Sequence, residues 1–282
     1  MKQMIKDGTI GKIQKIDLQY YQGWINPIIK DPELRKTVWR LDPEKGGLSC
    51  CIGDIGTHAF NMAEFLTGMK IDKILADLNY LYPENQMDVD GTILVRFSEY
   101  CKGVIRASQI ATAEENSFTV QIYGENGCFK WNQENPNYLY QLMEGKPIQI
   151  LKPGNSYLSD FSLKSSKLPP GHPEGFFDAM GNIYNGVAKA LNERGIAAFV
   201  LKYRLVPIQL IGKDEGLYHP YSKEKKQLAY GHLDALNAIA HVRENALKYE
   251  INPDKIGIVK LSFNGRGINS TNMAVKAPIT KT

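Results

Sequence analysis

The sequence predicts an α+β fold: an open, mostly antiparallel or mixed sheet with helices on one face, followed by a small α/β unit of the β-α-β kind. The first observation is a run of β-rich segments over residues 73–131, preceded by a helical pattern, which favours a sheet covered by helices. The second is that continuously apolar segments alternate with one amphipathic helix after about residue 190, which is typical of a parallel unit. We therefore expect two domains, residues 1–188 and 189–282.

The first domain is predicted to begin with a short helix, a strand and a loop. Residues 1–8 have helical character, and Gly8 is placed to end that helix. Residues 10–24 alternate apolar and polar side chains and are rich in β-formers, so we expect a strand. Residues 26–47 are rich in Pro, Gly and charge and indicate a long functional loop.

A helix and five strands follow that loop. Apolar side chains between Ala59 and Leu66 recur at helical spacing, and Gly68 ends the pattern. The β-rich segments are residues 73–82, 90–98, 102–111, 116–124 and 127–131. A further helix is predicted from Glu174 onward.

Residues 189–282 follow a different pattern. Residues 195–205 and 254–262 predict apolar strands, and residues 232–251 predict the helix between them. The second strand leads to Ser262 and resembles the approach to the nucleophile of the α/β-hydrolase esterases. That turn requires a G-x-S-x-G sequence, whereas Lys260 and Asn264 occupy the two glycine positions here. We therefore interpret Ser262 as a vestigial nucleophile in a partial hydrolase segment.

Composition excludes several classes of protein. The net charge is +4, and 43% of residues are hydrophobic, as in an ordinary soluble protein. The densest basic cluster, Lys223 to Lys226, is interrupted by Glu224, so we expect no nucleic-acid partner. No apolar run approaches the ~18 residues of a membrane span. The four cysteines form no CxxC pair, which argues against a zinc site or a disulfide framework. We expect a cytoplasmic protein, although an export signal could have been lost with a preceding segment.

Asp54 and His58 are the leading candidates for chemistry. Four residues separate them, which would place both on one face of a helix. A carboxylate beside an imidazole orients the ring and raises its basicity, so the pair could remove a proton from a hydroxyl. Asp54 could instead cap the helix, with His58 a structural histidine. A metal site is also conceivable, but the sequence offers no third ligand at useful spacing.

Aromatic and basic side chains near this pair indicate a sugar site. Aromatic rings stack on sugar faces, and arginine supplies directed hydrogen bonds. Tyr20 and Trp24 could equally belong to the core of the first strand. The residues that we expect to bind substrate are Tyr21, Trp24, Trp39, Arg40, Asn61 and His172.

Several motifs together resemble one enzyme family. Residues 46–61, GGLSCCIGDIGTHAFN, resemble the GGxxxDxGxHxxD-type signature of the Gfo/Idh/MocA oxidoreductases. The segments YYQGW, VWRLDPEKGG, ASQIA, WNQENPN and PPGHPEGFFDA occur in the order of that family's C-terminal domain, so the resemblance covers roughly residues 1–185. It implies that His58 is the acid/base for a hydroxyl of a sugar or polyol and that Asp54 is its partner. It also implies NAD(P) as cofactor and a homo-oligomer formed through the sheet face. Asn61 replaces the Asp of many relatives, which removes a charge near His58.

The nucleotide-binding half of such an enzyme is not recognisable in the sequence. There is no G-x-G-x-x-G at the start of a β-α-β unit and no Glu-Lys-Pro motif, so we expect no complete Rossmann domain and no cofactor bound by this chain alone. The sequence thus predicts a truncated NAD(P)-dependent sugar or polyol oxidoreductase, catalytically incomplete by itself. The alternatives are a non-catalytic carbohydrate-binding or oligomerisation protein and a decayed fusion product; an esterase fits less well.

Overall fold

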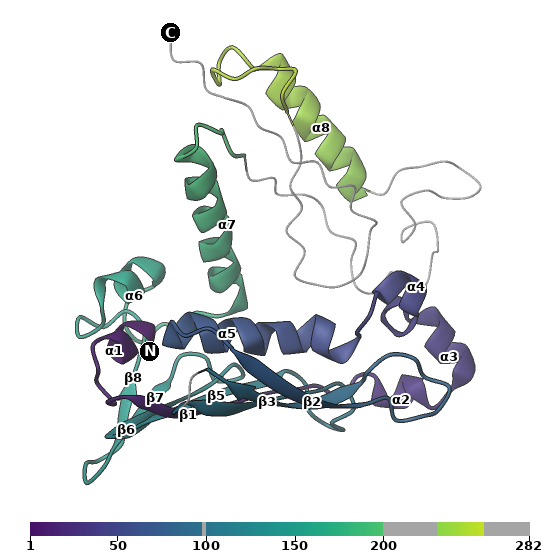
Figure 1. The fold of residues 1–282 in the computed structure, drawn as a ribbon. Helices are drawn as coiled ribbons and strands as arrows, with labels where there is room; N and C mark the ends of the chain where they lie inside the picture. Colours follow the sequence, from purple (N-terminus) through teal and green to yellow (C-terminus); the bar gives the residue numbers. More distant parts are fainter. Residues whose placement is uncertain (98–99, 200–229, 257–282) are drawn as a thin grey trace. The chain divides into compact units, whose positions relative to one another are not determined.

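A computed structural model describes residues 1–97, 100–199 and 230–256 of the chain (Figure 1). The chain divides into two compact units, Met1–Asp178 and Ala179–Thr282. Helix α7, Phe176–Asn192, spans this division and also contains the boundary that the sequence predicts after residue 188. Each unit is therefore considered separately.

The first unit is built on a mixed sheet of eight strands within the described residues. Their bounds are β1 Ile13–Tyr21, β2 Lys73–Asn79, β3 Asp90–Arg96, β4 Lys102–Ser108, β5 Ser117–Gly124, β6 Gly127–Asn132, β7 Leu139–Met143 and β8 Gln149–Leu151. The strand order is β2-β3-β4-β1-β5-β6-β7-β8. Strand β1 runs parallel to β4 and antiparallel to β5, and the remaining neighbours are antiparallel. The predicted mixed, open sheet is confirmed, but β7 and β8 were not predicted because such short strands show too little alternation.

Helix α5, Thr57–Thr67, covers one face of this sheet (Figure 1). Side chains alternate along a strand, so every second residue of β1 points toward α5. Ile16 and Leu18 are fully buried there and share one apolar core with Ala59 and Ala63 of the helix. Burying an aliphatic side chain of this size stabilises the fold by roughly 1.5–3 kcal/mol. The sheet and the helix are thus held together by a continuous core.

Two helix ends depend on glycine, as the sequence predicts. Helix α1, Lys2–Lys6, is followed by Gly8 at φ 75°. The amides of Gly8 and Thr9 donate to the carbonyls of Ile5 and Met4, which satisfies the last turn of the helix. Helix α5 ends at Gly68, whose φ is 72°. Left-handed backbone of this kind favours glycine because the residue has no Cβ.

The segment predicted as a long loop, residues 26–47, forms short helices instead. They are α2 Asn26–Ile29, α3 Pro32–Thr37, the 3₁₀ turn η1 Trp39–Leu41 and α4 Pro43–Gly46. Asp31 accepts hydrogen bonds from the amides that open α3, and Asp42 does the same for α4. Each of these aspartates is followed by a proline in the first helical position, which is a strong start signal. The prediction was wrong because the helices are too short to produce an apolar period.

The described part of the second unit contains most of α7 and helix α8, Tyr230–Glu244. The helix predicted over residues 232–251 is confirmed as far as Glu244, and turns follow it. Residues 195–199 form a turn and irregular backbone, so the described start of the first predicted strand is not a strand. The rest of that segment, most of the second predicted strand and Ser262 lie outside the described residues. None of the helices described is long and apolar enough to cross a membrane.

Candidate functional site

The Asp54 carboxylate is bound by donors from two other segments. Its Oδ2 lies 3.1 Å from Arg40 Nε and accepts a hydrogen bond of 2.8 Å from Gln109 Nε2. Its Oδ1 accepts a longer bond of 3.3 Å from an Arg40 terminal amino group. Arginine thus grips both oxygens in the fork geometry that strengthens such pairs. Asp54 is therefore a fixed, neutralised anion.

Two buried polar side chains position the turn that carries Asp54. This turn, η2 Ile52–Gly56, is π-helical. The Asp88 carboxylate accepts hydrogen bonds from the amides of Cys50 and Ile52, at 2.9 and 2.8 Å. The Cys50 thiol donates to Gln109 Oε1 over 3.3 Å, which directs the amide nitrogen of Gln109 toward Asp54. Sequence reasoning missed Asp88 and Gln109; the available signal for Asp88 was a carboxylate between the apolar Met87 and Val89, just before a predicted strand.

His58 lies in the first turn of α5 and is exposed. Its ring centre is 6.0 Å from that of Tyr20, with the rings tilted by 50°. The Tyr20 hydroxyl donates to Asn116 Oδ1 over 2.6 Å, and burial, with a smaller contribution from Asp54, raises the pKa of Tyr20. Tyr20 therefore presents a neutral phenol beside the imidazole.

Within the described residues no hydrogen bond joins His58 to Asp54. The expected pairing relied on the 3.6-residue period of an α-helix. Asp54 lies instead in π-helical backbone, whose hydrogen bonds span five residues rather than four. Asp54 contacts Arg40 and Gln109, whereas the ring of His58 contacts Tyr20.

Arg40 connects Asp54 to two tryptophans. Its guanidinium carbon is 5.7 Å from the centre of the Trp24 ring and 4.8 Å from that of Trp39, as in cation–π contacts. The Trp24 indole donates to Gln22 Oε1 over 3.1 Å. The Trp39 indole nitrogen is buried and has no hydrogen-bond partner in the part of the chain that the structure describes. Trp24, Trp39 and Arg40 are thus brought together as the sequence predicts.

The other predicted substrate residues are not joined to this group. Tyr21 follows Tyr20 in β1 and therefore points to the opposite face of the sheet, where Arg106 and Asp17 are its charged neighbours. Asn61 is exposed one turn beyond His58. His172 is exposed and makes a local contact of 3.3 Å with the carbonyl of Pro169.

The electrostatics of the site disfavour added negative charge. Arg40 and Asp54 cancel one another, and Asp88 lies close behind them. Burial, reinforced by Asp88 and Asp54, raises the pKa of the Cys50 thiol to about 12. An anionic ligand at this place would be repelled by the same two carboxylates, Asp88 and Asp54. Across the described residues no group of three His, Cys, Asp or Glu side chains could hold a metal ion.

The turn that precedes α5 does not fit the pyrophosphate of a dinucleotide. Such a group needs free backbone amides at a glycine turn that opens a helix. Near α5 these amides are already engaged: that of Gly53 donates to Ser49 Oγ over 2.8 Å and that of Asp54 to the Cys50 carbonyl over 2.9 Å. The glycines of this segment serve the π-helical turn.

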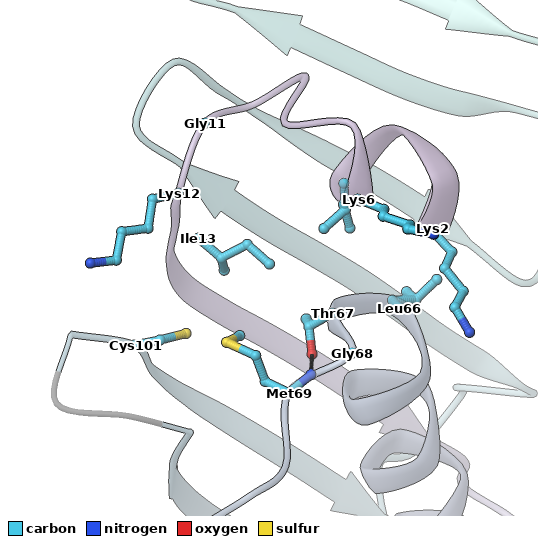
Figure 2. Close-up of a pocket in the computed structure, with 11 residues that line it drawn as sticks. Lys2, Lys6, Gly11, Lys12, Ile13, Leu66, Thr67, Gly68, Met69 and Cys101 are labelled. Carbon is cyan, nitrogen blue, oxygen red and sulfur yellow. Dashed lines mark hydrogen bonds between the residues drawn. The ribbon is translucent and has the colours of Figure 1, made fainter.

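A hollow of about 320 Å³ lies between α1, the start of β1 and the end of α5 (Figure 2). None of the predicted site residues lines it. Figure 2 shows Lys2 and Lys12 extending away from it, and their amino groups lie 3.8 and 4.3 Å from the ring centres of Phe65 and Tyr100. The hollow thus presents neither the predicted chemistry nor a convergent cationic site.

Comparison with known proteins relates the first unit to a family of domains. Residues 1–130 match the GFO/IDH/MocA C-terminal domain, and the curated relatives that match the chain are oxidoreductases. An uncharacterized oxidoreductase, YfiI of Bacillus subtilis (strain 168), is 29% identical over 196 residues, which are 69% of this chain. A levoglucosan dehydrogenase of Pseudarthrobacter phenanthrenivorans is 27% identical over 161 residues, or 49% of this chain.

The structural comparison agrees with the fold. An inositol dehydrogenase homolog from Azotobacter vinelandii, solved with NAD+, gives a TM-score of 0.63 at 27% identity over 69% of this chain. The same homolog with NADH and myo-inositol gives 0.59 at 25% identity over 69%. This chain covers 51% and 50% of those two chains, and 50% and 40% of the two curated relatives. It therefore spans about half the length of the proteins that it matches.

Proposed function

We propose that residues 1–188 form the substrate-binding and assembly part of an NAD(P)-dependent oxidoreductase that acts on a hydroxyl of a neutral sugar or polyol. The observation that carries the proposal is the convergence of Tyr20, Asp54 and His58 with the Arg40–tryptophan cluster in a Gfo/Idh/MocA C-terminal domain. The relatives named for inositol and levoglucosan act on uncharged polyhydroxylated molecules, which agrees with this chemistry.

His58 is the group that would exchange a proton with the substrate hydroxyl. It is exposed at the start of α5, so a ligand can reach its ring. Its neighbour Tyr20 is a neutral phenol whose hydroxyl is already bonded to Asn116. Asp54 is engaged by Arg40 and Gln109, so its role is to fix these donors rather than to carry the proton. In this assignment His58 alone carries the proton that is exchanged with the substrate hydroxyl.

The neutrality of the site supports a neutral substrate. The Arg40 charge is balanced by Asp54, so little positive potential remains for a carboxylate or phosphate. The partly exposed rings of Trp24 and Trp39 suit the apolar faces of a sugar instead. We therefore exclude sugar acids from the proposed substrate class.

The cofactor is assigned to a separate nucleotide-binding domain. Because the amides near α5 are engaged, the turn that precedes α5 supplies no cradle for NAD(P), and we derive no hydride-transfer step through it. Assembly through the sheet face that is opposite α5 forms part of the same proposal.

Binding of myo-inositol tests the proposal directly. In a Trp131→Phe background the fluorescence comes from Trp24 and Trp39, both next to Arg40. We expect saturable quenching by myo-inositol or levoglucosan and none by glucuronate at equal concentration. His58→Ala should weaken binding about ten-fold, because it removes one ligand hydrogen bond.

His172→Ala is the matched control, since His172 is an exposed histidine with only a local contact. It should bind as the unmodified protein does. Equal binding by His58→Ala, with an unchanged melting temperature, would remove His58 from the site. Absence of saturable binding by both neutral ligands would refute the proposed substrate class.

A further inference from the structure

A second, larger cavity lies at the far end of the sheet from β2. Its volume is about 580 Å³, within the range of sites that hold small organic molecules. It is enclosed by α1, β7, β8 and α6, Asp160–Ser165, which lie together in Figure 1. Its lining includes the apolar residues Met1, Met4, Leu139, Leu151 and Leu158 and the polar residues Gln141, Tyr157, Ser159 and Ser162. No residue of the candidate sugar site lines it.

Gln141 stands where the sheet otherwise places apolar side chains. In the register of the strands it pairs with Phe129, which pairs with Ile122, which pairs with Ile16. These three neighbours are fully buried on the core face. Gln141 is only 8% exposed, so a buried polar residue follows the three buried apolar residues across these strands. An apolar side chain would fit this position without any polar cost.

Gln141 lines the cavity, and its side-chain amide makes no hydrogen bond to another described residue. The amide atoms are not among the fully buried polar atoms that lack a partner, so solvent or a ligand in the cavity can reach them. Its oxygen and nitrogen remain available from the cavity. The unpaired amide and the cavity therefore point to the same ligand site.

The lining restricts the chemistry of that ligand. No side chain that lines the cavity is charged at neutral pH. Met4, Leu139 and Leu151 provide an apolar wall. The space is far larger than the ~30 Å³ of one water molecule, so a single water would leave most of it unfilled.

We propose that this cavity binds a small uncharged molecule whose amide or lactam group pairs with Gln141 and whose apolar body packs against Met4, Leu139 and Leu151. A primary amide presents a donor and an acceptor side by side, and a second amide offers the complementary pair. A carboxylate of the same shape offers acceptors alone and brings a charge that no side chain of the lining neutralises.

Methyl-labelled methionine NMR with cyclohexanecarboxamide tests this site. Met1 and Met4 report from the cavity, while the buried Met87 belongs to the other apolar cluster. We expect saturable shifts of the Met1 and Met4 signals, no shift of Met87, and no shifts with cyclohexanecarboxylate.

Variants at the two neighbouring glutamines make the test specific. Gln141→Leu should weaken binding of cyclohexanecarboxamide about ten-fold, because the paired hydrogen bonds are lost. Gln149→Leu is the control, because Gln149 pairs with Gln141 in the sheet but is exposed at the rim. It should change binding less than two-fold.

Several outcomes would overturn the proposal. They are the absence of shifts in the unmodified protein, equal binding of the carboxylate, and unchanged binding by Gln141→Leu. A lower melting temperature of Gln141→Leu without loss of binding would mean that ordered water satisfies the amide. If Gln141→Leu does not fold, Gln141→Asn withdraws the amide by one methylene, and it too should weaken the Met1 and Met4 response.

Discussion

The Asp54 carboxylate depends on residues far from it in the sequence. Gln109 follows β4 and is itself oriented by the Cys50 thiol, so two buried groups and the half-buried Asp54 form one chain of hydrogen bonds. Arg40 closes this chain from η1 and is in turn packed between two tryptophans. A change at any member would alter the direction of the next, because buried networks of this kind are cooperative.

The raised pKa of the buried Cys50 thiol predicts how its reactivity depends on pH. Its pKa is raised from 9.0 to about 12, so at pH 8 only about 10⁻⁴ of it is thiolate. We expect alkylation by iodoacetamide at pH 8 to be at least ~100-fold slower than in urea, where the thiol is free. The shift also contributes stability that is complete below pH 9 and is lost as the pH rises toward 12, because the unfolded chain ionises first.

Quantifying the alkylated Cys50 peptide by mass spectrometry against time measures this directly. The same peptide from the urea-unfolded chain is the reference. Native and unfolded rates that agree at pH 8 would contradict the burial of Cys50 behind Asp88. The melting temperature between pH 8 and pH 11 should fall, and a rise over that interval would contradict the sign of the shift.

The candidate site was predictable in its residue types but not in its contacts. Asp54, His58, Arg40, Trp24 and Trp39 stand in one short stretch of sequence, and chemistry alone selects them. The partners lie further along the chain: Asp88 shortly before β3 and Gln109 directly after β4. Their role appears only when β3 and β4 bring their ends to the π-helical turn. Such long-range partners leave no spacing pattern in the sequence.

Helices and turns were predicted wherever a local signal was strong. Gly8 and Gly68 end their helices in left-handed backbone, as expected. The same reasoning failed over residues 26–47, because an aspartate followed by proline was treated as loop composition rather than as a helix start. It also failed at η2, since a π-helical turn differs from an α-helix in geometry and not in composition.

The left-handed backbone at Gly68 predicts how substitutions at the end of helix α5 change stability. Its φ of 72° is left-handed, and a Cβ added there would meet nothing within 4 Å. Gly68→Ala should therefore destabilise the first unit through backbone strain alone, by about 1 kcal/mol. Gly68→Asn should lose less, because asparagine tolerates this conformation better. Chemical denaturation followed by circular dichroism measures both.

Gly175→Ala is the matched control for that experiment. Gly175 also has open space around it but no positive φ, so alanine should be accepted without loss. A loss for Gly68→Ala no larger than that for Gly175→Ala would show that the end of α5 does not constrain the fold. Equal losses for Gly68→Ala and Gly68→Asn would exclude left-handed strain as the cause.

At the scale of the whole molecule, the sheet face opposite α5 is only partly apolar. Leu75 and Leu94 lie on it in register and are 69% and 49% exposed. The ion pair between Arg106 and Asp17 lies on the same face, and Arg106 Nε is buried without a partner among the described residues. Isolated exposed leucines are common, but a row of them across neighbouring strands favours an interface.

We expect copies of the chain to assemble through this face, and the symmetry of such an assembly makes the expectation testable with a single substitution. A two-fold dimer buries the same patch twice, so one substitution at its centre acts on both copies. We expect the protein to have a mass above the 31.7 kDa of one chain in size-exclusion chromatography with light scattering. Leu94→Glu should shift it toward the monomer, because two desolvated carboxylates would face each other. Leu34→Glu is the control, since Leu34 is 46% exposed but lies on α3. A monomeric unmodified protein, or an oligomer that survives Leu94→Glu with its melting temperature unchanged, would show that this face stays open to solvent.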